Sequence, residues 1–160
     1  MIAIIGCGNL NRKDDAVGPA VIRLLKETAI DDQAVKLLDA GTDGMAVMFA
    51  ARGCERLIIV DACLSGSEPG AVFEVPGERL QKPRVQGINL HDFRWENALH
   101  AGQQIYKENF PEDVAVFLIE AKETGYGIGM SPEVETSARL VAEKILTRID
   151  EWTAKGTNAV

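Results

Sequence analysis

Carboxylate side chains occur in this sequence at the points where strands of a sheet would end. Two adjacent acids follow a glycine turn after the first apolar run, and three more each follow another apolar run. These acids are Asp14, Asp15, Asp39, Asp61 and Glu120. Each alone is compatible with a helix cap or a loop acid, but carboxylates gathered at one edge of a sheet can bind a divalent cation. Asp61 directly follows the apolar residues 57–60, so its carboxylate needs a partner or a raised pKa.

The glycine turn itself has the form of a phosphate-binding turn but carries the wrong charge for one. An apolar run, the turn Gly6-Cys7-Gly8 and an amphipathic segment follow one another, as in nucleotide-binding motifs. Asp14 and Asp15 would repel a phosphate from the helix start. No GKS or GKT follows, and Asn11 stands where a dinucleotide motif has its third glycine. The turn therefore indicates a cation site.

His91 is a further candidate metal ligand. If Asn89 caps a helix, His91 occupies its second position, where the positive helix end favours the neutral, metal-binding imidazole. His100 lies about half a turn out of phase with His91 at 3.6 residues per turn, so the two cannot bind one ion from the same helix face. Two carboxylates and one imidazole suit a divalent ion with open coordination positions better than a closed structural zinc site. A partly buried polar role for His91 stays open.

Short apolar runs alternate with longer segments of helical periodicity. The expected strands are residues 2–5, 35–38, 57–60, 71–75 and 114–119. The expected helices are residues 17–26, residues 45–51, one from Asn89 with Leu90, Phe93, Ala98, Ala101 and Ile105 facing the core, and one from Pro132. This alternation predicts an α/β fold: a three-layer sandwich with a mostly parallel twisted sheet of about five strands flanked by helices, in a single domain over residues 1–160. Ligands of such sheets bind beyond the carboxyl ends of the strands.

The composition narrows the partners and the compartment. The net charge of −7 disfavours nucleic acid and anionic membrane surfaces. No apolar run approaches the roughly 20 residues that cross a bilayer, and three cysteines without a CxxC pair predict reduced thiols in the cytoplasm. No GxSxG motif is present, and Cys7 is interpreted as a small buried thiol rather than a nucleophile.

Five separated segments resemble the signature of one protein family in the same order along the chain. They are Gly6-x-Gly8-Asn9 with Asp14-Asp15-x-x-Gly18, Asp39-Ala40-Gly41-Thr42-Asp43-Gly44, residues 57–62, Leu90-His91, and Gly127-Ile128-Gly129-Met130-Ser131-Pro132. The chain resembles the hydrogenase maturation endopeptidases, which remove a C-terminal extension from the large subunit of [NiFe] hydrogenases. Ala40 and the segment 87–90 depart from the family pattern.

The resemblance implies that Asp15, Asp61 and His91 are both the metal ligands and the catalytic residues, and that Asp14 is a cap or supporting acid. It implies no permanently bound cofactor: the metal is the nickel already inserted in the partner, the large-subunit precursor. A free divalent metal can also occupy the site. Metal polarisation of the scissile carbonyl and a carboxylate general base both remain open. Two alternative functions remain: a metal-dependent small-molecule hydrolase and a non-catalytic nickel-binding maturation factor.

Overall fold

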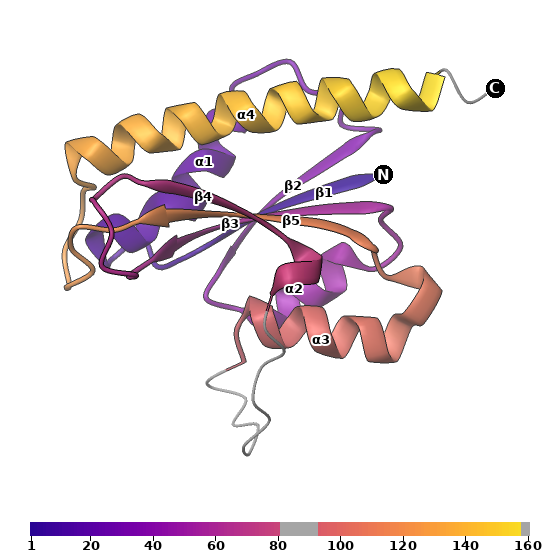
Figure 1. Ribbon diagram of the computed structural model, residues 1–160, viewed down its shortest axis with the longest axis horizontal. Coiled ribbons are helices and arrows are strands. Elements are labelled where there is room, and N and C mark those ends of the chain that lie inside the picture. The colour runs from indigo at the N-terminus through magenta and orange to yellow at the C-terminus, as the bar shows by residue number, and fades with distance from the viewer. Residues whose placement is uncertain (81–92, 158–160) are drawn as a thin grey trace.

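The computed structural model describes residues 1–80 and 93–157, which form a five-stranded sheet covered by helices on both faces (Figure 1). The strands are β1 (Ile2–Cys7), β2 (Val35–Gly41), β3 (Arg56–Cys63), β4 (Val72–Pro76) and β5 (Asp113–Glu120). Their order in the sheet is β2-β1-β3-β5-β4, with every pair parallel except β4 and β5. The predicted mostly parallel α/β sandwich is therefore confirmed.

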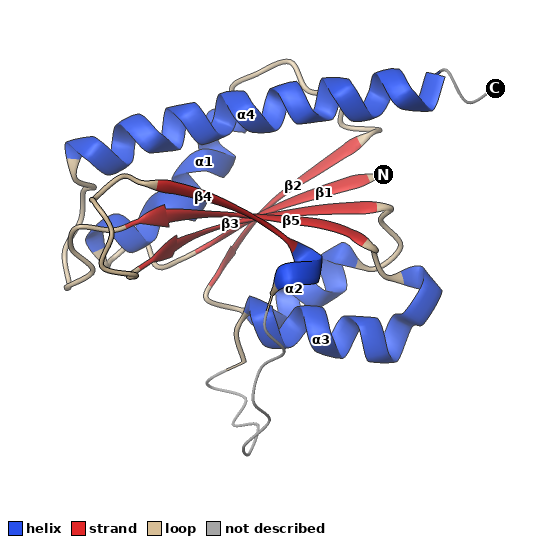
Figure 2. Ribbon diagram, viewed as in Figure 1, coloured by secondary structure: helices blue, strands red, loops and turns tan. Residues whose placement is uncertain are grey.

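In the described part of the chain, four α-helices pack in two layers on opposite faces of the sheet. They are α1 (Val17–Lys26), α2 (Gly44–Ala51), α3 (Trp95–Tyr106) and α4 (Pro132–Thr157). Helices α1 and α4 cover one face, and α2 and α3 cover the other (Figure 2). A 3-10 turn, Lys13–Ala16, leads directly into α1.

Strand β1 packs against the helices on both faces of the sheet. All six of its residues are buried. Ile2 and Ile4 pack with the side chains of α1 and α4, whereas Ala3 and Ile5 pack with those of α2 and α3. Successive side chains of a strand point to opposite faces, so a continuous apolar run is what a strand covered on both sides requires.

Helix α4 agrees with the sequence at its start and along its buried face. Pro132 is its first residue, where the missing N–H of proline costs no hydrogen bond. The buried residues recur every three or four positions: Val134, Ala138, Val141, Ile145, Ile149 and Trp152. Within residues 1–80 and 93–157, no helix has both the length and the apolar character needed to cross a membrane.

Helix α3 starts later than predicted, and its buried face agrees with the prediction at Ala98 but not at Ile105. It begins at Trp95, after an extended Arg94 with ψ of 176°, so a continuous helix from Asn89 is wrong. Its buried residues are Trp95, Ala98, Leu99 and Gly102. Ile105, predicted to face the core, is 62% exposed. The buried indole of Trp95 sets the phase of the helix, and Leu90 lies outside the described residues.

Candidate active site

A cleft of about 800 Å³ opens beyond the carboxyl ends of β1, β2 and β3. Its walls come from the turn after β1, the loop after β2, the end of β3 and the start of α3. Asp15 and Asp61, two of the three predicted site residues, both line it. The topology therefore brings together two carboxylates that are 46 residues apart in the sequence, at the position where open α/β sheets bind ligands.

Two glycines allow the segment that carries Asp15 to approach the sheet. Gly8 has φ of +141°, and a Cβ there would lie 1.8 Å from the carbonyl oxygen of Asp15. A Cβ on Gly18 would lie 2.2 Å from the Cys7 carbonyl oxygen. Any larger residue at either position would push the start of α1 away from the strand ends. The turn also fixes the Asp15 side chain, because the Asn9 N–H donates to Asp15 Oδ2 at 2.8 Å.

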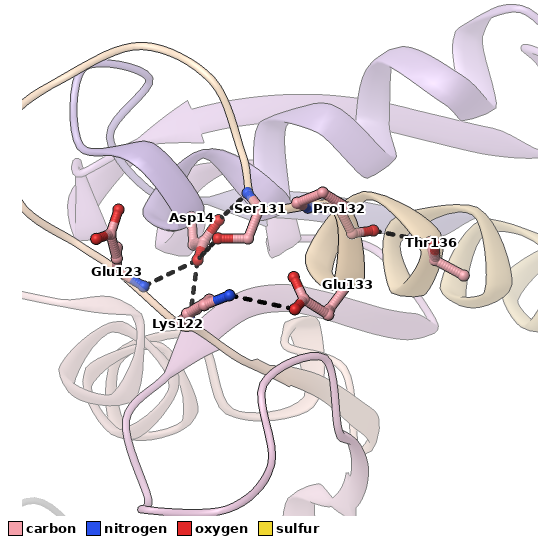
Figure 3. A network of polar contacts seen from close by, with 7 residues as sticks. All are labelled: Asp14, Lys122, Glu123, Ser131, Pro132, Glu133 and Thr136. Carbon is pink, nitrogen blue, oxygen red and sulfur yellow. Dashed lines mark hydrogen bonds and ion pairs between the residues drawn. The ribbon is translucent and has the colours of Figure 1, made fainter.

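Asp14 is absent from the described lining of the cleft, and its carboxylate joins three segments of the chain (Figure 3). Its Oδ2 accepts from the N–H groups of Lys122 and Glu123, both at 2.9 Å, and from the Ser131 hydroxyl at 2.9 Å. Its Oδ1 accepts from the Ser131 N–H at 2.6 Å. Burial raises the pKa of Asp14, but the hydrogen bonds from Ser131, Glu123 and Lys122 outweigh this and hold that pKa below its usual value. Asp14 is therefore a structural anchor, and Asp15 faces the cleft.

Asp61 is a buried carboxylate held by three donors. Its side chain is 4% exposed. Oδ1 accepts from the Ala62 N–H at 2.8 Å, and Oδ2 accepts from Trp95 Nε1 at 2.8 Å and from the Arg94 guanidinium at 3.3 Å. Burial raises the pKa of Asp61 to about 6, although the bonds from Trp95 and Arg94 oppose the shift and the nearby Asp15 adds to it. The sequence argument that a carboxylate after 57–60 needs a partner or a raised pKa is confirmed on both counts.

Because the pKa of Asp61 is raised by folding, its ionised carboxylate lowers the free energy of unfolding at neutral pH. Well below about pH 4, Asp61 is protonated in both the folded and the unfolded state. As the pH rises toward about 6, Asp61 loses its proton in the unfolded state but keeps it in the folded state. The free energy of unfolding therefore falls over this range. Asp61→Asn cannot ionise. The wild-type free energy of unfolding should therefore fall relative to that of Asp61→Asn by about 2–3 kcal/mol between pH 4 and pH 7. Urea denaturation of both proteins at several pH values measures this, and a pH-independent difference would contradict it.

Two other acids predicted at strand ends are absent from the described lining of the cleft. Asp39 is exposed near the end of β2, and its Oδ1 accepts from the Gly41 N–H at 2.9 Å in the same strand. Glu120 is 2% exposed and holds the turn after β3, accepting from the N–H groups of Ser65 and Gly66. Bonds from Ser65 hold the pKa of Glu120 below its usual value. Asp39 therefore organises the end of β2, and Glu120 organises the turn after β3.

The thiols do not provide a nucleophile at neutral pH. Cys7, Cys54 and Cys63 are free cysteines. Burial raises the pKa of Cys7 and Cys54, and burial together with the Glu120 carboxylate raises the pKa of Cys63 to about 12. The interpretation of Cys7 as a buried thiol is confirmed, since it is 6% exposed.

The predicted third ligand, His91, lies outside the described residues, so the set Asp15, Asp61 and His91 stays a prediction. Across the described part of the chain, no three His, Cys, Asp or Glu side chains are grouped to hold a metal ion. His100 is half-buried in α3 and does not appear in the described cleft lining. Asp15 and Asp61, which line the cleft together with Asp43 and Glu96, are oxygen ligands suited to a divalent ion that brings further ligands of its own.

Among the cleft residues that sequence reasoning missed are Arg94, Trp95 and Glu96. Arg94 and Trp95 contact Asp61 from 33 and 34 residues away, a pairing that no local pattern reveals. An Arg-Trp pair soon after the candidate ligand His91 was the available signal. Trp95 adds a neutral donor to the site, and Arg94 adds a positive charge.

The fold and the cleft together define an α/β protein with an acid-lined site beyond the carboxyl ends of its parallel strands. The family model for hydrogenase maturation proteases matches residues 19–148. The chain belongs to this family, whose members process the C-terminus of the hydrogenase large subunit, and it is therefore a peptidase. The predicted family membership and reaction class are confirmed.

Relatives of known sequence and structure agree. The chain is 26% identical to the hydrogenase 2 maturation protease of Escherichia coli over 94% of this chain and 91% of that protein. It is 29% identical to the coenzyme F420 hydrogenase subunit delta of Methanothermobacter thermautotrophicus, over 92% and 94%. The solved structure of the E. coli hydrogenase maturating endopeptidase HybD matches with a TM-score of 0.79 and 26% identity, covering 94% of this chain and 92% of that one.

Proposed function

We propose that this peptidase removes the C-terminal extension of a [NiFe] hydrogenase large-subunit precursor in the cytoplasm, after nickel has been inserted. Asp15, Asp61 and His91 coordinate the nickel that the precursor carries. The observation that carries the proposal is the meeting of Asp15 and Asp61 in one cleft, on segments that resemble the family signature. Membership of a peptidase family favours this function over a small-molecule hydrolase and over a non-catalytic nickel-binding factor.

The two site carboxylates that the structure describes, Asp15 and Asp61, differ in burial and in the donors that hold them. Asp61 is buried and fixed by Trp95 and Ala62, so it offers a ligand in a set position. Asp15 is half-buried and held through Oδ2 by the Asn9 N–H; no donor among the described residues contacts its Oδ1. Fixed ligands hold a metal-bearing substrate with its scissile bond in the cleft, which saves the entropy of orientation.

The hydrolysis adds water across one peptide bond: the hydroxyl goes to the carbonyl carbon and a proton goes to the leaving nitrogen. Nickel carried by the precursor would act as a Lewis acid that polarises the scissile carbonyl and stabilises the charge on its oxygen. A carboxylate of the cleft takes the proton from the attacking water. The protease itself needs no permanent metal for these steps.

Exposed apolar side chains beside the cleft support a protein substrate. Tyr126 and Ile128 are 84% and 88% exposed on the loop between β5 and α4. This loop is joined to the turn after β1 by the bridge between Arg12 and Gly127, and Arg12 lines the cleft. Large apolar side chains so exposed are typical of surfaces that contact another protein. We propose that the precursor contacts them while its C-terminus enters the cleft.

Cleavage assays with a matched pair of precursors test the proposal. Purified large-subunit precursor, prepared with and without nickel, is incubated with this protein, and the mass of the large subunit is measured. We expect the nickel-loaded precursor to lose its C-terminal extension and the nickel-free precursor to stay intact. Equal cleavage of both would refute recognition of nickel, and cleavage of neither would refute the substrate.

A further inference from the structure

Arg94 places a positive charge directly on the carboxylate that the proposed function assigns to the metal. It is the last residue before α3, and its side chain is 63% exposed. Its guanidinium lies 3.3 Å from Asp61 Oδ2, whereas the Asp61 side chain is 4% exposed. The pair thus joins a buried anion to a cation that can move into solvent.

A metal ion bound at Asp61 Oδ2 competes with the Arg94 guanidinium, which already contacts that oxygen. Guanidinium keeps its proton at every relevant pH, so it cannot become neutral when a second cation arrives. Two cations at one carboxylate repel each other strongly where solvent is partly excluded. Trp95 donates to the same Oδ2 at 2.8 Å, but the indole is neutral and can stay. Binding of a metal at Asp61 Oδ2 therefore requires Arg94 to leave.

Glu96 provides a second position for the displaced guanidinium. Its Oε2 is buried and has no hydrogen-bond partner among the described residues. Arg94 Nε already lies 3.8 Å from this oxygen, too far for a hydrogen bond. A buried carboxylate oxygen without a donor is unfavourable, so a guanidinium released from Asp61 gains a partner by moving a short distance toward Glu96.

From these contacts we infer that Arg94 is a specificity-determining residue that keeps free divalent cations off Asp61 and yields to a metal ion held by the precursor. The inference rests on the proposed function. A free ion must displace Arg94 with its own coordination energy alone. A metal ion carried by the precursor arrives together with the protein contacts of the precursor, and these contacts add to the binding free energy.

Calorimetric titration of the whole protein with Ni²⁺ alone tests the inference. Arg94→Gln removes the charge, and Arg94→Lys is the matched control that keeps it. We expect Arg94→Gln to bind Ni²⁺ about tenfold more tightly than wild type, as for the loss of an ion pair with one buried partner, and Arg94→Lys to stay nearer wild type. The gain should vanish when Asp61→Asn is added to Arg94→Gln. Equal affinity of wild type and Arg94→Gln, or a gain that survives Asp61→Asn, would overturn the inference.

The precursor assay separates failure of this inference from failure of the proposed function. With nickel-loaded precursor, cleavage by Arg94→Gln should be inhibited by free Ni²⁺ at about tenfold lower concentration than cleavage by wild type, in line with its higher affinity for the ion. If wild type cleaves nickel-loaded precursor but free Ni²⁺ inhibits both proteins at the same concentration, only the proposed role of Arg94 is refuted. If wild type cleaves no precursor, the proposed function falls first.

Discussion

Asp61→Asn is expected to lower the rate of cleavage of nickel-loaded precursor at least about a hundredfold while the protein stays folded. The asparagine side chain is nearly the same size, but it is neutral and has one oxygen where Asp61 has two. The oxygen that remains can still accept from Trp95 or from Ala62, but the amide nitrogen then faces the other donor. The variant thus loses an anionic metal ligand without leaving a cavity. Mass spectrometry of the large subunit at timed intervals gives the rate.

Asp39→Asn is the matched control for this loss, because it makes the same chemical change at an exposed position near the end of β2, at the same edge of the sheet. Its cleavage rate should remain within about twofold of wild type, as for most surface substitutions away from a site. Thermal unfolding of both variants checks that each is folded. Cleavage by Asp61→Asn at the wild-type rate would remove Asp61 from the active site and leave the cleft without its buried ligand.

Asp14→Ala is expected to lower the free energy of unfolding by about 3 kcal/mol or more. The substitution deletes the acceptor of four hydrogen bonds, three of them from backbone N–H groups. Asp14 is 0% exposed, so water cannot readily replace it. The loop after β5 and the start of α4 would both lose their link to the turn that carries Asp15. Urea denaturation at pH 7 measures the effect.

Asp113→Ala is a suitable comparison for Asp14→Ala. Asp113 forms an ion pair with Arg56, with its side chain 55% exposed, and its loss should cost at most about 1 kcal/mol.

The pH dependence of stability gives an independent check of the role of Asp14. The pKa of Asp14 is lowered by folding, so its stabilisation is present above the unfolded value near 3.8 and is lost as pH falls below it. A decrease in the free energy of unfolding of less than about 1 kcal/mol for Asp14→Ala at pH 7 would contradict the role of Asp14 as a structural anchor.

Segments with unambiguous local signals could be predicted from the sequence. The run 57–60 is apolar throughout and became the centre of β3, and Ser131-Pro132 marked the start of α4. Both signals are local: a strand covered on both faces needs a continuous apolar run, and proline fits only the first turn of a helix. The position of the cleft then followed from the parallel topology, which gathers the strand ends at one edge.

The start of α3 and the surroundings of Asp61 could not be predicted in this way. A cap at Asn89 was an acceptable local reading, but the tertiary contact of Trp95 with Asp61 fixed where the helix begins and which face is buried. The difference between Asp14 and Asp15 is also long-range. The partners of Asp14 lie 108 to 117 residues away, and the pattern of two adjacent acids does not tell which one they bind. Such pairings depend on the assembled fold rather than on local propensity.

The hydrogen bond between Trp95 and Asp61 makes the fluorescence of Trp95 sensitive to the state of the cleft. The indole N–H sits 2.8 Å from the buried carboxylate, so the electric field at this chromophore changes whenever the charge on Asp61 is neutralised, shared or released. The second tryptophan, Trp152, lies near the end of α4 against Arg56 and Arg148, at the other end of β3. The protein thus carries an intrinsic fluorescent reporter inside its own site, together with a remote tryptophan as an internal reference.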